Sequence, residues 1–581
     1  MSRSLLKRLV ILRHQKYHEH ILKRCVSVSS CKNNISNNIL SNTEKIDIPR
    51  VSLSEYVFGK SEPYGEFVAF ECPLTHLKYT NAEVRKYSRN LSKILRAKLG
   101  LNKGDVVLIY LPNCPQFPIA TLGCLEAGVI ASTVNSLYTA DEVFRQLKDS
   151  SSKIIFTTCD LYATAAKAAS ALPKKIPIIC IKTKPEQLLP QGAIDFYELI
   201  KTTLDIPDLE PPRFEDAAIL PYSSGTTGLP KGVRLTHGNI VANLTQSSHP
   251  SVDFFESASG NFQEVTPGVL PMFHIYGFTA ATIKLMTKGV KVVTLPRFQP
   301  ETFIDVLKNY PITTIFAAPP LILFLTHYPD VKVEYFKTLK NVMSGAAPLG
   351  ASDEEKFKEK AGKHVSIFQG YGLTETSPVV SLVTPSLTRQ FPNDCKGSIG
   401  RVLLNTEIKF VKLDDKSGTA LPPHEKGELL VRGPQVMEGY HNNPQATKDT
   451  FLGDWFRTGD MGHYNENGFM FITDRVKELI KVRGFQVAPA ELEEILRSHP
   501  KVADAAVVGI PDEISGEVPR AYIQTKGDVD TKEIYHFVAD KVAKYKRLEG
   551  GIEVIKDIPK NASGKILRRE LKDRYLSEQN A

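Results

Sequence analysis

The sequence predicts an α/β protein, and three observations lead to this prediction. Short apolar runs rich in β-branched residues alternate with helical patterns over residues 105–147, which is typical of parallel strands joined by crossover helices. Residues 395–435 combine turn residues with an alternating polar and apolar pattern, which favours antiparallel strands. A new amphipathic unit follows residue 474. A chain of 581 residues is long enough for more than one domain.

The elements of the large domain are expected in a fixed order. Strands are predicted at 105–111 and 129–134, and helices at 117–126 and 140–147. The apolar stretch 312–325 contains Pro319 and Pro320, so it is expected to be a buried strand followed by a turn and a helix start rather than a membrane span. We expect folded structure to begin near Val51, after a targeting segment and linker at residues 1–48.

The small domain is expected to begin after a strand at 469–473. The boundary is placed between Asp474 and Arg475, which gives domains at 49–474 and 475–581. Within the second domain, residues 489–496 have an early proline and acidic first turns, which predicts a helix. A strand at 505–510 and a helix at 531–545 complete a small α+β domain.

Composition excludes several classes of protein. The 42% hydrophobic and 24% charged content is that of a soluble globular enzyme, and no window has the roughly 18 uninterrupted apolar residues of a membrane span. The eight cysteines include no Cys-x-x-Cys pair, so no zinc site is predicted and a reducing compartment is expected.

Basic charge is concentrated at the N-terminus. Residues 1–34 have eight Lys or Arg and one Glu, a net +7, which leaves +2 of the total +9 for the remainder. Binding to nucleic acid is therefore not predicted. Basic residues interleaved with leucines, followed by a serine-rich stretch, predict a mitochondrial transit peptide that is removed near residue 27. A solvated disordered tail is the alternative.

A loop at 222–233, Tyr-Ser-Ser-Gly-Thr-Thr-Gly-Leu-Pro-Lys-Gly-Val, is suited to holding a polyphosphate. Its glycines let backbone N–H groups approach anionic oxygens, its hydroxyls add donors and Lys231 adds a positive charge. It differs from the Walker pattern because Gly232, rather than Ser or Thr, follows the lysine. Ordinary γ-phosphoryl transfer is therefore not expected.

Further motifs follow this loop in a fixed order. They are Pro-Met-Phe-His-Ile-Tyr-Gly at 271–277, Ser-Gly-Ala-Ala-Pro-Leu-Gly at 344–350, Gln-Gly-Tyr-Gly-Leu-Thr-Glu at 369–375, Gly-Glu-Leu-Leu-Val-Arg-Gly-Pro at 427–434, Trp-Phe-Arg-Thr-Gly-Asp at 455–460, Asp-Arg-Val-Lys-Glu-Leu-Ile-Lys at 474–481 and Pro-Lys-Asn-Ala-Ser-Gly-Lys at 559–565. With this series the chain, over roughly residues 50–575, resembles the adenylate-forming superfamily, and within it the 4-coumarate:CoA ligase-like and firefly-luciferase-like acyl-CoA synthetases.

The resemblance implies a fold and a reaction. The fold would comprise a large N-terminal domain of layered α/β sheets with a β-barrel-like subdomain, and a small mobile C-terminal domain. The reaction would be ATP-dependent ligation of a carboxylic acid, fatty or aromatic, to coenzyme A through an acyl-adenylate, with Mg²⁺ as the metal. The oligomeric state is left open. A luciferase-like monooxygenase and a non-catalytic ligand-binding descendant are the alternative functions.

The resemblance also implies roles for single residues. Glu375 matches the Mg²⁺ ligand and Thr374 an α-phosphate donor, while Asp460 and Arg475 match ribose contacts. Catalytic roles fall to Lys565, Thr374, Glu375, His274 and Lys481. The predicted nucleotide-binding set is Ser223, Ser224, Gly225, Thr226, Thr227, Gly228, Lys231, Gly345, Ala346, Ala347, Gln369, Gly370, Tyr371, Thr374, Asp460, Arg475, Lys481, Gly484, Gln486 and Lys565.

The two lysines of the C-terminal domain would act in different domain orientations. Lys565 matches the lysine that bridges the substrate carboxylate and the α-phosphate during adenylation, which requires the small domain to close over the large one. Lys477 matches a hinge position. Lys481, Gly484 and Gln486 would lie on the face presented in the other orientation or close to AMP. His274 and Tyr276 resemble residues at the wall of the acyl pocket.

Two features depart from the relatives. Phe368 stands where plant 4-coumarate ligases commonly have glycine, so the acyl cavity should differ in shape. The C-terminus, Ser-Glu-Gln-Asn-Ala, differs from the Ser-Lys-Leu-like peroxisomal ending of many luciferase-like relatives. Together with the basic N-terminus this favours the mitochondrial matrix, with the peroxisome or cytoplasm as alternatives.

Overall fold

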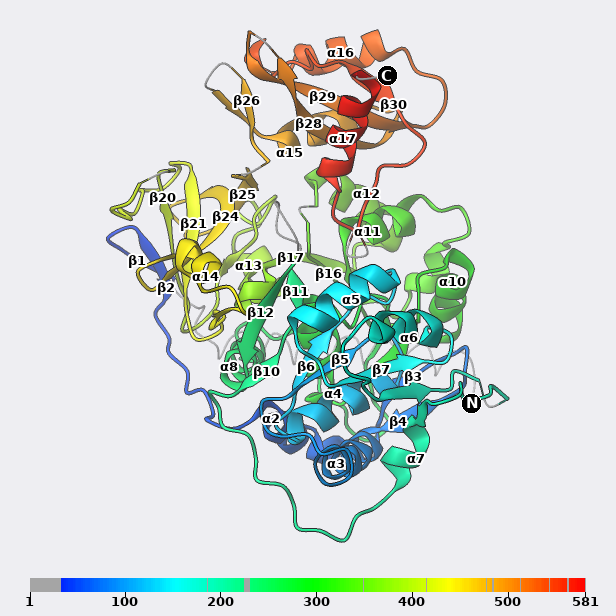
Figure 1. Cartoon of the computed structure of the whole chain (residues 1–581). Helices are drawn as coiled ribbons and strands as arrows, with labels where there is room; N and C mark the ends of the chain where they lie inside the picture. The colour runs from blue at the N-terminus through cyan, green and yellow to red at the C-terminus, as the bar shows by residue number, and fades with distance from the viewer. Residues whose placement is uncertain are drawn as a thin grey trace, which may run out of the picture.

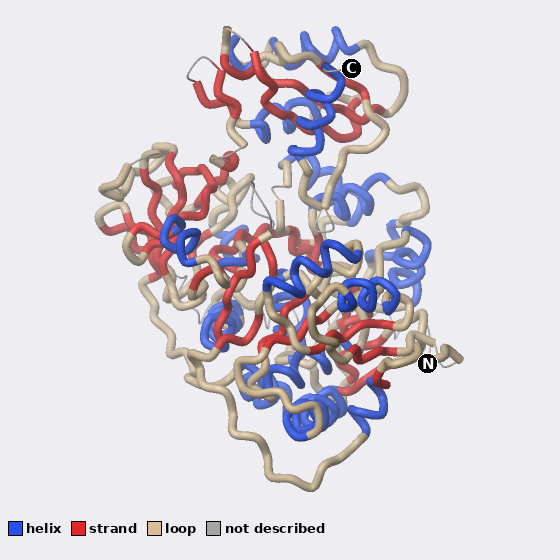
Figure 2. Tube along the Cα trace, in the orientation of Figure 1, coloured by secondary structure: helices blue, strands red, loops and turns tan. Residues whose placement is uncertain are grey.

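The computed structural model describes residues 33–184, 186–223, 230–347, 349–413, 415–476, 478–482, 485–512, 514–542, 544–561 and 564–579, and of residues 33, 485, 486 and 579 it describes the backbone alone. Figures 1 and 2 show a large layered body with a small domain at one end, formed by the last hundred residues. Within the described part of the chain, no helix is long and apolar enough to cross a membrane.

A nine-stranded sheet forms the centre of the large domain. Parallel strands β5, β6, β7 and β8 confirm the α/β prediction. The chain passes between them through α4 (Gln116–Glu126), α5 (Ala140–Asp149) and α6 (Tyr162–Ser170). The sheet order is β11 (Tyr222–Ser223), β12 (Lys231–Thr236), β10 (Ala217–Ile219), β6 (Ile130–Thr133), β5 (Val106–Ile109), β7 (Ile154–Thr158), β8 (Ile178–Ile181) and β9 (Ile194–Asp195), with β22 (Gly439–Tyr440) beside β12.

Two smaller sheets complete the layers of the large domain. One has the order β13 (Val265–Gly268), β14 (Lys291–Thr294), β3 (Val68–Glu71), β4 (Lys78–Thr80). The other has the order β15 (Thr314–Ala317), β16 (Asn341–Ser344), β17 (Ser366–Gly372), β18 (Val379–Leu382), β19 (Arg401–Val402). The expected strand and helix within 312–325 are β15 and α11 (Pro319–His327), where proline occupies the first helical turn.

The remaining helices of the large domain cover these sheets. Four helices begin with a reciprocal capping box, in which the N-cap side chain and the third helical residue satisfy each other's backbone N–H groups. The helices not yet named are α2 (Leu53–Ser61), α3 (Asn81–Ala97), α7 (Phe196–Lys201), α8 (His237–Ser247), α9 (Lys284–Met286), α10 (Pro300–Asn309), α12 (Ala351–Ala361), α13 (Pro385–Gln390) and α14 (Pro444–Thr450), with a π-helix at Tyr276–Ile283.

The antiparallel subdomain is a seven-stranded sheet. Its order is β1 (Asn33–Ser36), β2 (Ile39–Asn42), β20 (Glu407–Val411), β21 (Gly427–Arg432), β24 (Trp455–Tyr464), β23 (Phe451–Leu452), with β25 (Met470–Arg475) paired to β24. The prediction that folded structure begins near Val51 is wrong, because the β1–β2 hairpin pairs with β20 and Leu40 is fully buried. The sequence of this polar hairpin gives little local indication of strands. The hairpin is ordered by pairing with a strand more than 360 residues further along the chain.

The C-terminal domain has its own five-stranded sheet and core. Its strands are β27 (Phe485–Val487), β26 (Ile480–Val482), β29 (Gly516–Thr525) and β28 (Val502–Asp512), with β30 (Ile552–Val554) beside β29. Helices α15 (Pro489–Arg497), α16 (Thr531–Ala539) and α17 (Arg568–Gln579) pack with it. The helix predicted over 531–545 ends at Ala539. The carboxylate of Asp474 accepts a hydrogen bond from Ala490 N at 3.0 Å and so satisfies an amide in the first turn of α15.

Candidate active site

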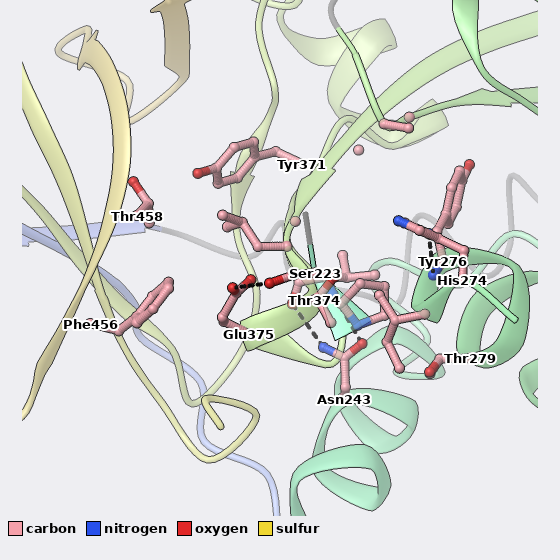
Figure 3. A pocket seen from close by; sticks show the side chains of 18 of the residues that line it. Ser223, Asn243, His274, Tyr276, Thr279, Tyr371, Thr374, Glu375, Phe456 and Thr458 are labelled. Carbon is pink, nitrogen blue, oxygen red and sulfur yellow. Dashed lines mark hydrogen bonds between the residues drawn. The ribbon is translucent and has the colours of Figure 1, made fainter. Parts of the chain in front are cut away.

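A cavity of about 500 Å³ lies where the large domain, the antiparallel subdomain and the C-terminal domain meet. Its walls come from segments more than 300 residues apart, including β11, the π-helix, the β17–β18 connection, β24 and the loop before α17. Figure 3 shows Tyr371, Thr458 and Glu375 on one side, and His274, Tyr276 and Thr279 on the other. Of the predicted site residues, the cavity is lined by Ser223, Lys231, His274, Gly345, Ala346, Gly370, Tyr371, Thr374, Glu375, Arg475 and Lys565.

Glu375 is a buried carboxylate held by hydroxyl groups. Ser223 Oγ and Tyr440 OH each donate to its Oε1 at 3.0 Å, and the first of these bonds is drawn in Figure 3. Lys231 lies beside them, with its Nζ 4.5 Å from the centre of the Tyr440 ring. Because both hydrogen bonds found among the described residues reach Oε1, Oε2 keeps acceptor capacity. The group therefore combines a fixed carboxylate with a nearby lysine.

Asp460 joins two of the cavity-lining residues. Tyr371 OH donates to its Oδ2 at 2.6 Å, and Arg475 Nε lies 3.1 Å from Oδ1. The register of β24 against β25 places Asp460 directly opposite Arg475. Burial raises the pKa of the Asp460 carboxyl, although Arg475 and the Tyr371 hydroxyl act in the opposite direction. A carboxylate with two oxygens can accept additional hydrogen bonds beyond these two.

Lys565 extends into the cavity from the C-terminal domain. Its Nζ lies 3.7 Å from Glu478 Oε1, and its backbone N donates to Asn561 Oδ1 at 2.9 Å. Burial lowers the pKa of the Lys565 amine, and the neighbouring Arg475 charge lowers it further, whereas Glu478 and Asp460 oppose this shift. The domain orientation in this structure therefore brings a cation from the last segment of the chain to the same cavity as Tyr371 and Glu375.

His274 and Tyr276 form part of the opposite wall. His274 Nδ1 accepts from Tyr276 N at 3.3 Å, and Tyr276 OH donates to Met343 O at 3.1 Å. Burial lowers the pKa of His274 to about 4, so the imidazole is neutral near pH 7. Gly345 packs closely against this wall, because an added Cβ would lie 3.0 Å from the Tyr276 ring.

The neighbouring loop is strained at the cavity edge. Ala346 has φ +70°, a left-handed backbone conformation that residues other than glycine adopt only at a cost in free energy. Gln369, predicted to contact nucleotide, does not line the cavity. Its Oε1 accepts from Leu349 N and its Nε2 donates to Leu349 O, both at 3.2 Å. Gln369 thus holds the Gly345–Ala346 loop against β17.

Other predicted site residues are not brought to the cavity or cannot be placed. Lys481 is exposed on β26 and does not line it, and neither does Ala347. Ser224, Gly225, Thr226, Thr227, Gly228, Lys477 and Gly484 lie outside the described residues, as does the side chain of Gln486.

Sequence reasoning missed several residues of the cavity wall. These are Asn243, Ser247, Phe254, Thr279, Lys284, Phe316, Tyr440 and Thr458. Thr458 lies within a quoted motif and could have been found from it. The others come from helices, strands and, for Phe254, a loop, and their sequence patterns indicate only structure, so no local signal distinguishes them. Phe368 is fully buried behind this wall, with its ring 4.9 Å from the Phe254 ring, so its effect on the cavity passes through Phe254.

Comparison with known proteins agrees with this geometry. The AMP-binding enzyme family model matches residues 60–441, and the AMP-binding enzyme C-terminal domain model matches residues 491–565. The chain belongs to the AMP-binding enzyme family. It is an AMP-forming acid–CoA ligase of the adenylate-forming superfamily that works through an acyl-adenylate.

Within the described residues, no cluster of three His, Cys, Asp or Glu side chains is found that could hold a metal ion.

The relatives of this AMP-binding enzyme include plant ligases. The chain is 37% identical over 535 residues to 4-coumarate–CoA ligase 3 of Oryza sativa subsp. japonica, which covers 91% of this chain and 93% of that protein. It is 38% identical over 508 residues to 4-coumarate–CoA ligase 2 of Solanum tuberosum, covering 86% and 89%. These matches show that the sequence resemblance extends over both domains.

Solved structures share the architecture. The o-succinylbenzoate CoA synthetase of Bacillus subtilis, in complex with its acyl-adenylate intermediate, is 29% identical with a TM-score of 0.74, covering 89% of this chain and 98% of that chain. An anthranilate CoA ligase in complex with anthranoyl-AMP has a TM-score of 0.81 at 23% identity, covering 92% and 99%. The second likeness concerns the fold alone.

Proposed function

We propose that both half-reactions of acid–CoA ligation occur in the cavity that Lys565 shares with Tyr371 and Glu375. In the first, a carboxylate oxygen of the acid attacks the α-phosphorus of ATP and pyrophosphate leaves. In the second, the CoA thiol attacks the acyl carbon, loses its proton and displaces AMP. The observation that carries this proposal is the convergence of Lys565, Arg475 and Glu375 on one cavity, because they come from both domains.

Lys565 would act in the first half-reaction. Its cationic amine would neutralise charge between the acid's carboxylate and the α-phosphate as they approach, which is electrostatic stabilisation of the transition state. Tyr371 would lie against the adenine ring and Asp460 would accept from the ribose hydroxyls, with Arg475 as a second contact. Ser223 and Lys231 are paired across strands β11 and β12 and would contact the phosphates.

The cavity also suits a magnesium ion. A buried carboxylate beside phosphate oxygens is the hard oxygen environment that Mg²⁺ prefers, and Glu375 Oε2 has no hydrogen-bond partner among the described residues. Glu375 would hold the ion, which would supply charge neutralisation to the triphosphate when bound. Ser223 and Tyr440 would keep the carboxylate in one orientation.

We expect Glu375→Gln to raise the Mg²⁺ concentration that gives half-maximal pyrophosphate release. The amide keeps the size of the side chain but removes its charge, so affinity should fall roughly tenfold or more, about 1.4 kcal/mol. Magnesium titrations of pyrophosphate release measure this. Tyr440→Phe is the matched control, because it removes one hydrogen bond to the carboxylate and leaves the charge. An unaltered magnesium requirement in Glu375→Gln would contradict the assignment.

Thioester formation would use a second domain orientation. Lys481 is exposed and outside the cavity in this structure, whereas its match to the family's motif implies a position close to AMP or on the face presented in the other orientation. We propose that the C-terminal domain, 475–581, turns relative to 49–474 once the adenylate has formed. This turn would withdraw Lys565 and bring the surface of Lys481, Gly484 and Gln486 to CoA.

A panel of acids tests the proposed function directly. Purified protein is incubated with ATP, Mg²⁺, CoA and fatty or aromatic acids of graded length, and pyrophosphate, AMP and thioester are measured. We expect AMP and thioester in equal amounts with at least one class of acid. Failure of every acid in a broad panel to yield AMP would remove the proposed function.

We also propose that the basic N-terminus directs the chain to mitochondria, on the charge pattern alone. Residues 1–32 lie outside the described part of the chain, and the hairpin that begins at Asn33 belongs to the fold. A fluorescent reporter fused to residues 1–32 should therefore enter mitochondria and lose its leader. Retention of the fusion in the cytosol would refute the targeting proposal without affecting the ligase activity.

A further inference from the structure

Polar side chains lie among apolar ones in the wall of the active-site cavity, where a purely apolar acyl chain would need only apolar contacts. Asn243, Ser247, Thr279 and Lys284 line it from α8, the π-helix and α9. Both donors of the Asn243 amide are used, because Nδ2 donates to Val379 O at 2.8 Å and to Gln246 Oε1 at 3.4 Å, and its Oδ1 accepts from Val379 N at 3.2 Å. In Figure 3, Thr279 lies on the side of His274 and Tyr276, away from Tyr371 and Thr458, and Asn243 lies between Thr279 and Glu375.

Lys284 is a buried cation in this part of the cavity. Its residue is 5% exposed, and its Nζ donates to Ser247 O at 2.6 Å and lies 3.4 Å from Asp253 Oδ1. Asp253 is shared, because Lys288 Nζ lies 2.7 Å from its other oxygen. Two lysines therefore face one carboxylate, which leaves a net positive charge.

The contact with Ser247 O accounts for only part of the Lys284 donor capacity. Ser247 ends α8, so this bond satisfies one carbonyl at a helix C-terminus, where a cation is favourable. An ammonium has three N–H donors, and among the described residues only Ser247 O and Asp253 Oδ1 are found as oxygen partners. The ammonium also lies 5.7 and 5.6 Å from the centres of the Phe254 and Phe255 rings, which offer a weaker cation–π contact and no oxygen acceptor. A buried, incompletely satisfied cation is costly, and a group that enters the cavity could satisfy it.

Thr279 provides a second and independent observation. It is 2% exposed, and its Oγ1 has no hydrogen-bond partner among the described residues. Buried hydroxyls are normally bonded, so this one also has unused capacity. The π-helix sets its position relative to Lys284, since Lys284 N donates to Thr279 O. This i to i+5 bond places the two residues one turn apart, and such π-helical turns are frequent at functional sites.

We infer that the acid activated by this enzyme has a second oxygen-bearing group at its distal end, which accepts a hydrogen bond from Lys284 Nζ and contacts Thr279 Oγ1. The inference rests on the proposed function, because it names the class of acid that the cavity takes. The distal group is a carboxylate, a carbonyl or a hydroxyl, since each accepts from an ammonium. A chain that ends in a methyl group would leave the third N–H of the Lys284 ammonium without an oxygen acceptor.

Matched acids test the inference. For each of several chain lengths, kcat/KM of pyrophosphate release is measured for the simple fatty acid, its ω-hydroxy form, its ω-keto form and its dicarboxylic form. Cinnamate derivatives with and without a distal hydroxyl or carboxyl form a second series. At the best length, the wild-type enzyme should favour an oxygen-bearing acid over its methyl-ended or unsubstituted counterpart by at least about tenfold, because sites built for hydrogen bonding reject analogues without the group. The most favoured form identifies the distal group.

The variants assign the preference to residues. Lys284→Met, which keeps length without charge, should remove most of the preference, and Thr279→Val should reduce it. Lys288→Met is the matched control, because Lys288 shares Asp253 but does not line the cavity; it should keep the preference. The ratio of kcat/KM between two acids is unaffected by the fraction of folded enzyme, so a loss of stability does not imitate the result.

Several outcomes would overturn the inference. Equal or higher kcat/KM for methyl-ended acids at every length would do so while leaving the ligase function intact. An equal loss of preference in Lys284→Met and Lys288→Met would assign the effect to the Asp253 network instead of a contact with substrate. If Lys284→Met does not fold, an unchanged preference in Thr279→Val overturns the inference. Absence of pyrophosphate release with every acid would refute the proposed function itself.

Discussion

Replacement of Lys565 by alanine should abolish most acyl-adenylate formation while leaving thioester formation from supplied acyl-AMP intact. The amine is expected to neutralise negative charge only while the acid's carboxylate attacks phosphorus. Loss of one such preorganised group typically costs about 10²–10³-fold in rate. Lys565 is the cation that the C-terminal segment brings to the cavity in this orientation, with its Nζ 3.7 Å from Glu478.

The two half-reactions are measured separately for this variant. Pyrophosphate release reports adenylation, and thioester appearance from synthetic acyl-AMP and CoA reports the second step. Lys572→Ala is a matched control, because Lys572 lies in the same domain and pairs with Glu517 outside the cavity; it should preserve both steps. Equal losses in both half-reactions of Lys565→Ala would argue against a role limited to adenylation.

Asp460→Ala should weaken ATP binding strongly. The carboxylate is 4% exposed, so it would accept hydrogen bonds from the ribose in a site shielded from water. Hydrogen bonds to a charged group contribute on the order of 1.5–3 kcal/mol, which corresponds to roughly 10–150-fold in Kd. Calorimetric titration with ATP and Mg²⁺ measures the change.

The Asp460 result needs a comparison because the carboxylate also bonds to protein groups. Tyr371→Phe removes the hydroxyl that donates to Oδ2 at 2.6 Å but keeps the ring and the carboxylate. We expect this variant to bind ATP with a much smaller loss than Asp460→Ala. If the two variants lose the same affinity, Asp460 acts by orienting Tyr371, and a ribose contact is excluded. ATP affinity unchanged in Asp460→Ala would also reject the ribose assignment.

Several parts of the fold could be predicted from local patterns. Strand β5 and helix α4 lie within about two residues of their predicted bounds, because buried parallel strands are continuous apolar runs and the helix between them is long enough to show its own pattern. The hairpin at 33–42 could not be predicted, since its residues are polar and its stability comes from pairing with β20. Helix α16 ends at Ala539, although the helical pattern of the sequence continues to Tyr545. A short 3₁₀ helix follows at Lys544–Lys546.

The motifs also differed in what they could reveal. Gln369 belongs to a nucleotide motif, yet its side chain bonds to Leu349 and supports a loop. Lys481 and Lys565 both match functional lysines, and only the relative position of the two domains decides which of them lines the cavity. A motif identifies residues that act together, but it contains no information about which of two domain orientations a structure has.

The sequence by itself determined the α/β class and the family, because these depend on local periodicity and on short motifs in a fixed order. Only the tertiary structure decided which buried polar atoms meet in the part of the cavity that we propose takes the distal end of the acid. Lys284 and Thr279 lie in an apolar helical segment with no motif, and the i to i+5 register between them exists only once the π-helix has formed. Whether a buried polar atom has a partner depends on segments far apart in the chain, here α8, α9 and the loop that contains Asp253. Hydrogen-bond satisfaction is a property of the packed structure, so no reading of the linear chain could reveal it.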